Sequence, residues 1–347
     1  MSLARAIATG DVAQLPSRRD EAWRWSDLRG LIRVLPPASG ASDAELPPGP
    51  FDGLADFEIA IVNGRGPPAV DLAEGETRRV ALRFVAAPGA GAHSACFAVN
   101  LGDGARCLLL ESYEGRGDGY VASADIDIRL GRGATLERIV MADDTGEGVS
   151  VSKTAVSLGA EAVFGQTVLT AGARRQRIET QLDHPGAGAV ARLDGLYLLG
   201  DKRHADITTV VSHCGAGGAT DQLTKGVVRD QARGVFQGRI VVAKGADQTD
   251  ARMGHHALVL SDRAEVDAKP ELEIYADDVL CAHGNTVGAL DEEALFYARQ
   301  RGIPEAQARA MLMQAFLAQV IDRIEDAGAR GAAADWLMRQ LEARDEF

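Results

Sequence analysis

The sequence predicts a mainly β protein in which short strands stack as a solenoid, with a small helical region before the strands and a helical domain after them. A unit of strand, Gly-rich turn and strand recurs, as in LGDGARCLLLES (101–112), IRLGRGATLERIV (128–140), VSLGAEAVFGQTVL (156–169) and HPGAGAVARLDGLYLLG (184–200). The Gly-Ala pairs of these units begin at 104, 133, 159 and 188, at intervals in the high twenties. Such recurrent turns are typical of a solenoid with two or three strands in each coil. A sandwich of β-hairpins is the alternative architecture.

Composition narrows the class of function. The 347 residues include 50 acidic and 37 basic side chains, for a net charge of −13, so nucleic acid is not an expected partner. No apolar run approaches the roughly 20 residues that a membrane-spanning helix needs. The first residues lack the apolar core of a secretory signal, and the four cysteines are scattered without a Cys-x-x-Cys pair. We therefore expect a cytoplasmic protein without disulfides.

Residues 1–50 are predicted to form a helical segment and a linker. Ser17 can cap a helix, with Asp20 three residues later, and Trp23 and Trp25 then pack this segment on the body of the protein. The Pro-rich stretch LPPASGASDAELPPGP follows as the linker.

Strands dominate from Phe57 onward. Glu58–Val62 and Val80–Val85 are expected within a mixed region, 51–95, that leads into the β core, 96–289. Near the end of that core, Pro270 is expected at the start of a strand, where its missing N–H is tolerated.

The segment Val279-Leu280-Cys281-Ala282-His283-Gly284 ends the predicted core. Because side chains alternate along a strand, Cys281 and His283 point the same way and could bind one metal ion or cluster. A lone Cys-x-His is more often a buried cysteine beside a hydrogen-bonded histidine. The pairs His255-His256 and Asp277-Asp278 are expected at the surface, while His184 and His213 lie in sequences typical of turns.

Helices are predicted over 290–347. Asp291 can cap the first, which ends near Gly302, and Pro304 opens the second. A third is expected from Ala333 to Leu341. An apolar stripe on the second helix either covers the last coil or binds a partner, and its residues are Leu312, Phe316, Val320 and Ile324.

Two segments resemble the SufB/SufD family of iron–sulfur cluster assembly proteins, most closely SufD: FQGRIVVAKGADQTDA and KPELEIYADDVLCAHGNTVGALDEEALFYARQRGI. The resemblance implies a right-handed parallel β-helix and a scaffold subunit of a SufB–SufC–SufD complex. It implies that Cys281 and His283 are iron or nascent-cluster ligands at the interface with SufB. It also implies that the C-terminal helices dock the ATPase SufC, with Leu312, Phe316 and Val320 as the expected face. A homodimer is expected for the isolated chain, with the cluster held only transiently and no cofactor bound tightly.

No catalytic motif accompanies these features. The sequence lacks the P-loop pattern G-x-x-x-x-G-K-[ST], so we expect a subunit that is not itself an ATPase or other enzyme. Two alternatives stay open. One is a β-helix hydrolase or lyase acting on polysaccharide, and the other is a structural homodimer without cluster chemistry.

Overall fold

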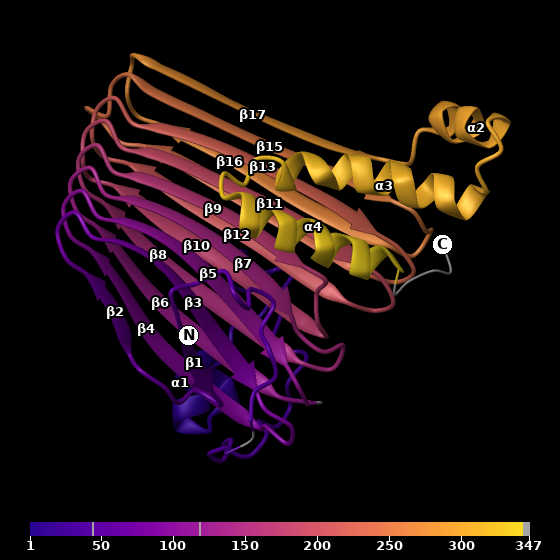
Figure 1. Ribbon diagram of the computed structural model, residues 1–347, viewed down its shortest axis with the longest axis horizontal. Helices are drawn as coiled ribbons and strands as arrows, with labels where there is room; N and C mark the ends of the chain where they lie inside the picture. The colour runs from indigo at the N-terminus through magenta and orange to yellow at the C-terminus, as the bar shows by residue number, and fades with distance from the viewer. Residues whose placement is uncertain (44, 118, 343–347) are drawn as a thin grey trace.

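A computed structural model describes residues 1–43, 45–117 and 119–342, and these form a parallel β-solenoid (Figure 1). Successive strands alternate between two sheets, so each coil contributes one strand to each sheet. Paired strands within a sheet are parallel and about one coil apart in sequence, as in the pairing of Arg177 with Asp206. The predicted solenoid is confirmed, and parallel pairing of the strands excludes the sandwich of hairpins.

The nine odd-numbered strands of the described chain form one sheet, called here the odd-strand sheet. They are β1 (Phe57–Val62), β3 (Thr77–Ala86), β5 (Arg106–Gly115), β7 (Thr135–Asp143), β9 (Val163–Thr170), β11 (Val190–Leu199), β13 (Ala219–Val228), β15 (Thr249–Val259) and β17 (Val279–Gly288).

The eight even-numbered strands form the facing sheet, called the even-strand sheet. They are β2 (Ala69–Leu72), β4 (Ala92–Leu101), β6 (Val121–Leu130), β8 (Val149–Leu158), β10 (Arg175–His184), β12 (His204–His213), β14 (Arg233–Val242) and β16 (Glu265–Ile274). Within the region 51–95, expected to be mixed, the chain from Phe57 onward already belongs to the two sheets.

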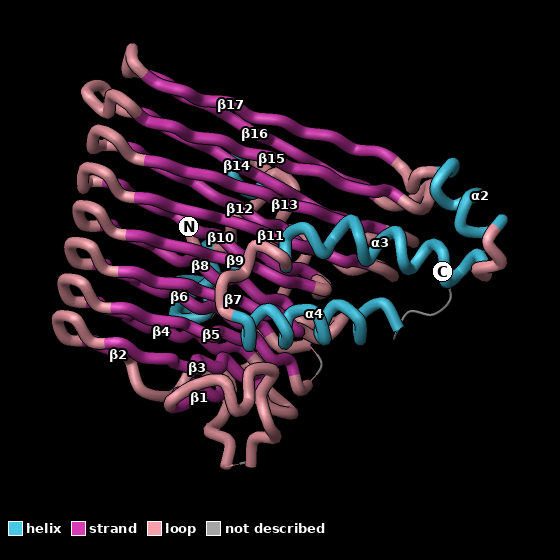
Figure 2. The backbone as a smooth tube through the Cα atoms, turned by 45° about the horizontal axis from the view of Figure 1, so that its top comes forward, coloured by secondary structure: helices cyan, strands magenta, loops and turns pink. Residues whose placement is uncertain are grey.

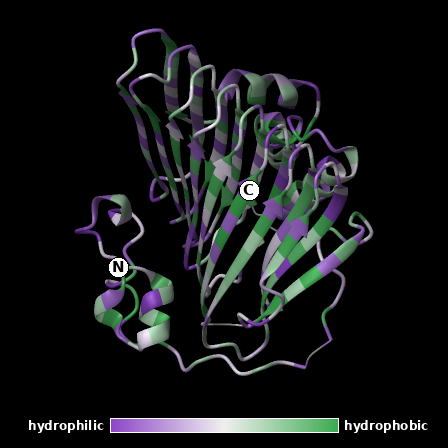
Figure 3. Cartoon of the chain, turned by 90° about the vertical axis from the view of Figure 1, so that its left-hand side faces the viewer, coloured by the Kyte–Doolittle hydropathy of each residue, from purple (hydrophilic) through white to green (hydrophobic). Residues whose placement is uncertain are grey.

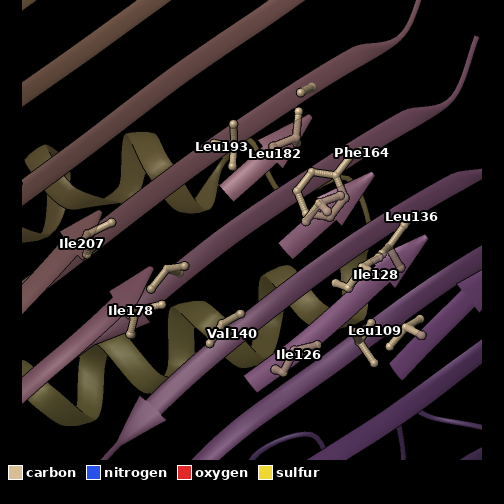
Figure 4. Close-up of a cluster of buried hydrophobic side chains, with 14 of the residues drawn as sticks. Leu109, Ile126, Ile128, Leu136, Val140, Phe164, Ile178, Leu182, Leu193 and Ile207 are labelled. Carbon is tan, nitrogen blue, oxygen red and sulfur yellow. The ribbon is translucent and has the colours of Figure 1, made fainter. Parts of the chain in front are cut away.

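Apolar side chains from both sheets meet in the interior of the solenoid. Figure 4 shows this core, with Leu136, Val140 and Phe164 from the odd-strand sheet facing Ile126 and Ile178 from the even-strand sheet. Intervening residues face outward, which gives many strands the alternating polar and apolar bands in Figure 3. Every coil therefore buries one face of each of its strands against the same continuous core.

The turns between β4 and β5, and between the later pairs, stack on one another. The Gly104 amide donates to the Arg132 carbonyl at 2.8 Å, and the Gly133 amide donates to the Ala160 carbonyl at 2.9 Å. Gly104 and Gly133 have φ of 65° and 62°, a conformation that glycine adopts without steric cost. In the next coil this conformation is taken by Glu161, with φ of 60°, rather than by Gly159. The recurrent Gly-Ala signal thus marks real turns, although not always the residue with positive φ.

The N-terminal segment lies on the outer face of the even-strand sheet. It contains α1 (Leu3–Thr9) and two short 3-10 turns, η1 (Val12–Gln14) and η2 (Glu21–Trp23). The helix predicted after Ser17 is therefore wrong, because carbonyls of this segment accept hydrogen bonds from the sheet instead of from helical amides. Arg177 donates to the Ala22 carbonyl at 2.7 Å, and its guanidinium lies 4.5 Å from the centre of the Trp23 ring. The prediction that Trp23 packs this segment on the body is confirmed.

The C-terminal helices are α2 (Glu292–Gln300), α3 (Glu305–Ile321) and α4 (Ala327–Glu342). Helices α3 and α4 lie across the outer face of the odd-strand sheet, whereas α2 projects beyond the ends of the strands (Figures 1 and 2). One interpretation of the sequence was that the apolar stripe of α3 covers the last coil. The structure differs, because the stripe packs on the outer face of the odd-strand sheet. None of the helices in the described residues is long and apolar enough to cross a membrane.

Candidate functional site

The two ends of the solenoid differ. At the N-terminal end the edge strands β1 and β2 are short, with six and four residues. The chain before them lies on the outer face of the odd-strand sheet, where Phe51 is buried and the Pro47 carbonyl accepts from Arg83 at 2.9 Å. At the C-terminal end, β16 and β17 are each ten residues long, and no strand of the described chain pairs with their outer edges (Figure 2). We call this surface the open end.

Apolar side chains are exposed around the open end. Leu280 and Val287 on β17 are 69% and 51% exposed, and Tyr275, which follows β16, is 63% exposed. An edge strand also leaves unpaired backbone N–H and C=O groups, which can pair with another chain. Pro270 lies in the middle of β16, opposite Gly238, and not at the start of the strand as predicted. It is tolerated there because β16 is an edge strand.

Cys281 and His283 lie on β17, on the side that faces the interior of the solenoid. Cys281 packs against the interior core, and His283 has the same orientation because it is two residues further along the strand. In register, Ala251 lies beside Cys281 and Met253 beside His283. Ala251 and Met253 are buried, whereas His283 belongs to the last coil and is exposed. The structure thus places both predicted ligands side by side at the open end.

The Met253 side chain fills the space beneath His283. Its sulfur lies 2.1 Å from the point where a Cβ on Gly238 would be, so Met253 crosses the interior to the opposite sheet. Because that space is occupied, the imidazole of His283 stays at the surface of the open end, where a second chain can reach it.

The Cys281 thiol is half-buried, and this burial raises its pKa above the ordinary value, with the nearby Asp250 carboxylate adding to the effect. A raised pKa keeps the thiol protonated, and the thiolate is the form that binds metal. Cys281 therefore needs a cation, such as iron, to displace its proton before it can act as a ligand.

The described residues contain no group of three or more His, Cys, Asp or Glu side chains that could hold a metal ion. Cys281 and His283 are two donors, whereas the irons of a cluster usually take four cysteine or histidine ligands in all. Further ligands would have to come from another chain placed against the open end.

Asn285 is a third polar side chain on the same face of β17, and the sequence analysis missed it. Its carbonyl oxygen lies 2.7 Å from Nδ1 of His255, which is fully buried although it was expected at the surface. Extending the alternation of Cys281 and His283 by two residues would have found Asn285. The same alternation along β15 distinguishes the two histidines, because His255 shares a face with Ala251 and Met253. The neighbouring His256 shares the face of Arg252, points outward and bonds to Thr286 at 2.7 Å.

The remaining candidate residues are not brought to this site. His184 and His213 end β10 and β12, where their buried rings stack 4.3 Å apart, so they are core residues and not turn residues. Asp277 and Asp278 are exposed in the bend before β17, as expected. The cysteines of the described residues, Cys96, Cys107, Cys214 and Cys281, are free.

The predicted docking face on α3 is used largely within the chain. Val320 is fully buried against the odd-strand sheet, so in this arrangement its side chain is not exposed to a partner. Leu312 and Phe316 are partly buried in the same contact, and the Lys225 ammonium lies 4.2 Å from the centre of the Phe316 ring. The large apolar side chains left exposed near this face are Phe296 and Tyr297 on α2 and Met311 on α3.

Comparison with known proteins identifies the family of this fold and site. The sequence profile described as "SUF system FeS cluster assembly, SufBD core domain" matches residues 84–316. The chain belongs to the SufBD family. The matched region contains most of the solenoid, the Cys281–His283 pair, α2 and most of α3, so the resemblance predicted from the sequence is confirmed.

Curated relatives carry the names of this family. The chain is 34% identical over 235 residues to the iron–sulfur cluster assembly protein SufD of Escherichia coli, covering 67% of this chain and 55% of the relative. It is 31% identical over 205 residues to a SufBD family protein of Synechocystis sp., covering 59% and 45%. A Mycobacterium bovis SufBD family protein is 28% identical over 349 residues, covering 90% and 86%. The chain thus spans about half the length of the first two relatives.

Proposed function

We propose that this SufD-like chain is a scaffold subunit for iron–sulfur cluster assembly and that its open end pairs with a second SufBD-type subunit, SufB. Cys281 and His283 supply ligands to the cluster that is built between the two subunits. The chain releases that cluster to other proteins, so the cluster is cargo and not a resident cofactor. The C-terminal helices contact the ATPase subunit SufC and transmit its movements to the interface.

The observation that carries this proposal is the asymmetry of the solenoid. The N-terminal end has edge strands of only six and four residues, whereas the C-terminal end presents two ten-residue edge strands with Cys281 and His283 between them. A long edge strand has unpaired backbone N–H and C=O groups that promote aggregation of an isolated protein. A strand from a partner chain can pair with these groups. When the chain is isolated, we expect a second copy to cover the same surface, which would give the expected homodimer.

The cluster chemistry is tested by replacing His283 with alanine in the co-expressed complex with SufB and SufC. Because His283 is exposed and fills no core space, His283→Ala should leave the thermal stability of the chain and the co-purification of the three subunits unchanged. The visible absorbance of the cluster should fall about tenfold at limiting iron, in line with the loss of a metal ligand. His256→Ala is the matched control, because His256 lies on the neighbouring strand but faces outward.

Two results would contradict this proposal. Unchanged cluster absorbance in His283→Ala would remove His283 from the ligand set. Failure of the chain to co-purify with SufB, together with a stable dimer of the chain alone, would instead favour a structural homodimer without cluster chemistry.

A further inference from the structure

A chain of hydrogen bonds runs through the interior of the solenoid and ends on Asn285 at the open end. The Tyr197 hydroxyl lies 2.9 Å from Nε2 of His255, and Nδ1 of the same imidazole lies 2.7 Å from the Asn285 carbonyl oxygen. Tyr197 is on β11, His255 on β15 and Asn285 on β17. The three side chains thus connect the middle of the core to the face that carries Cys281 and His283.

The Tyr197 and His255 rings in this series of hydrogen bonds are held in fixed positions. Tyr197 extends over Gly226 of the intervening strand β13, where an added Cβ would lie 1.8 Å from the ring carbon Cζ. A Cβ on Gly234 would lie 2.5 Å from Cε2 of the same ring. The His255 imidazole stacks on Phe236 with 4.8 Å between ring centres and 1° between planes. Tyr197, Phe236 and His255 are fully buried, so neither ring has room to turn away.

The chemistry of the groups sets the direction of these hydrogen bonds. The Asn285 carbonyl oxygen at Nδ1 of His255 can only accept, so Nε2 of the neutral ring is left as the acceptor for the Tyr197 hydroxyl. Burial raises the pKa of Tyr197 above its ordinary value, so the hydroxyl keeps the proton that it donates. Burial also lowers the pKa of His255 to about 4, so the ring is neutral at neutral pH and carries its one proton on Nδ1. That proton is donated to the carbonyl oxygen of Asn285. The amide NH2 group of Asn285 is therefore turned away from the interior.

The outward amide group has no acceptor among the described residues, and it lies next to the predicted ligands. Asn285, His283 and Cys281 alternate along one face of β17, so neighbouring members are roughly 7 Å apart along the strand. The sulfur atoms of a cluster and of its thiolate ligands accept hydrogen bonds, and such bonds tune how firmly the cluster is held and its reduction potential. A cluster attached at His283 would bring its sulfur atoms within reach of Asn285.

We propose that Asn285 donates a hydrogen bond to a sulfur atom of the cluster assembled at the open end and that His255 and Tyr197 are positioning residues that hold the Asn285 amide in this orientation. This inference rests on the function proposed above. It adds to that function a non-ligand residue on β17 and a buried pair that acts only through it.

The experiment compares Asn285→Ala, Tyr197→Phe and His283→Ala in the complex co-expressed with SufB and SufC. Asn285→Ala should raise the iron concentration needed for half-maximal cluster absorbance by about tenfold. It should also lower the reduction potential of the bound cluster, because a hydrogen bond to sulfur favours the reduced form. Tyr197→Phe keeps the packed ring and should change both quantities in the same direction by a smaller factor. Nitrogen NMR of His255 in the isolated chain should show a single Nδ1–H tautomer in the wild type and a mixture in Tyr197→Phe.

Each outcome decides between the two proposals. If His283→Ala lowers cluster formation while Asn285→Ala and Tyr197→Phe leave iron dependence and potential unchanged, the role of Asn285 is wrong and the proposed function stands. If Asn285→Ala prevents co-purification with SufB, the amide binds the partner's backbone and the assignment to sulfur is wrong. If His283→Ala has no effect, the proposed function fails and the role of Asn285 fails with it. A wild-type His255 protonated on Nε2 would overturn the positioning roles directly.

Discussion

Individual polar residues inside the solenoid are the feature that the sequence predicts least well. Arg138 and Glu111 form a fully buried ion pair at 2.7 Å in the interior, and Arg138 also donates to Gln166 at 2.6 Å. Alternation along β7 places Arg138 between Leu136 and Val140, which both face inward. A charged residue in such a pattern would normally be assigned to the outer face. Only the contact with Glu111, which is 27 residues away in sequence, explains its burial.

The stacked histidines His184 and His213 are a second buried polar group. The Thr220 hydroxyl lies 2.9 Å from Nε2 of His213 and 3.3 Å from Nε2 of His184, and Nδ1 of each ring has no hydrogen-bond partner. They occupy a column of inward-facing positions that continues with Val242 beside His213. The pair therefore stands where aliphatic side chains stand in other coils.

This pair should make the stability of the protein depend on pH. Burial lowers the pKa of His184 to about 3 and that of His213 to about 4. Below pH of about 6.5 the unfolded chain takes up protons at these histidines and the folded chain does not, so the free energy of unfolding falls as the pH falls. The loss by pH 5 should be about 2 kcal/mol for each histidine, from the difference between the two pKa values.

Urea unfolding at pH 7 and pH 5 checks this expectation. The double variant His184→Leu/His213→Leu should lose less stability between the two pH values than the wild type, by about 2–4 kcal/mol. His256→Gln serves as the control, since His256 is only partly buried and should change the pH dependence little. Equal pH dependence in the double variant and the wild type would show that the buried pair is not responsible.

At the scale of single elements, local sequence rules predicted the starts of α2 and α3 well and the helix surfaces poorly. Asp291 caps α2 by accepting from the amides of Glu293 and Ala294, and α3 begins directly after Pro304. Helix α4 begins at Ala327, six residues before the predicted start, because Ala329 and Ala333 pack closely on the sheet despite the glycines nearby. The stripe on α3 was visible in the sequence, but its partner is the outer face of the odd-strand sheet. Continuous apolar runs such as Leu108–Leu110 indicate strands buried on both faces, but they do not reveal which element covers the outer face.

Helix α2 is the element most suited to a partner such as the SufC ATPase. It projects from the solenoid (Figure 1), and Phe296 and Tyr297 are 62% and 61% exposed. Of its residues only Leu295 is buried, so changes at Phe296 and Tyr297 should not disturb the fold. Phe296→Ala/Tyr297→Ala should weaken SufC binding by at least about 2 kcal/mol, or roughly 30-fold in Kd, as measured by calorimetry.

A variant on α4 provides the matched control for this test. Met338 is 37% exposed on a neighbouring helix, and Met338→Ala should leave the Kd for SufC unchanged. Deleting all residues from Leu290 onward is a weaker test, because it would also expose the face formed by Leu110, Ile139 and Leu196 and promote aggregation. Binding that survives Phe296→Ala/Tyr297→Ala would move the SufC contact away from α2.

At the scale of the whole molecule, the sequence repeat made the solenoid predictable. The segments that pack on the outer faces of the two sheets were not predictable, because they are held by long-range contacts. Recurrent turns at 104, 133 and 188 and alternating strands were enough to predict the solenoid. The N-terminal segment covers one sheet and the C-terminal helices cover the other, through contacts such as Arg177 with Ala22 and Arg79 with Asp326. These contacts join residues 155 and 247 positions apart, and neither partner carries a local signal for the other. The pair Cys281 and His283 could be predicted because β17 is regular, whereas the burial of His255 depends on Tyr197.

The arrangement of coils predicts a gradient of stability along the molecule. In a stack, each coil contacts only its neighbours, so an inner coil is supported on two sides and an end coil on one. Strand β11 pairs with both β9 and β13, whereas β17 pairs only with β15. In dilute isolated chain, amide hydrogen exchange should therefore be slowest in β11 and β13 and faster in β16 and β17. At the other end, the loop that contributes Phe51 should slow exchange in β3 relative to β17.

Pairing of a SufB strand with the open end should slow hydrogen exchange at that end of the solenoid and leave the N-terminal end unchanged. Half of the backbone amides of an edge strand point away from its single neighbour, and a partner strand would supply their acceptors. Adding SufB should therefore slow exchange in β17 and leave β1 and β3 unchanged, with mass spectrometry as the measurement. Protection of β17 that instead rises with the concentration of this chain alone would mean that a second copy covers the open end. Protection gained at β1 or β2 would place the partner at the N-terminal end, where neither Cys281 nor His283 could reach it.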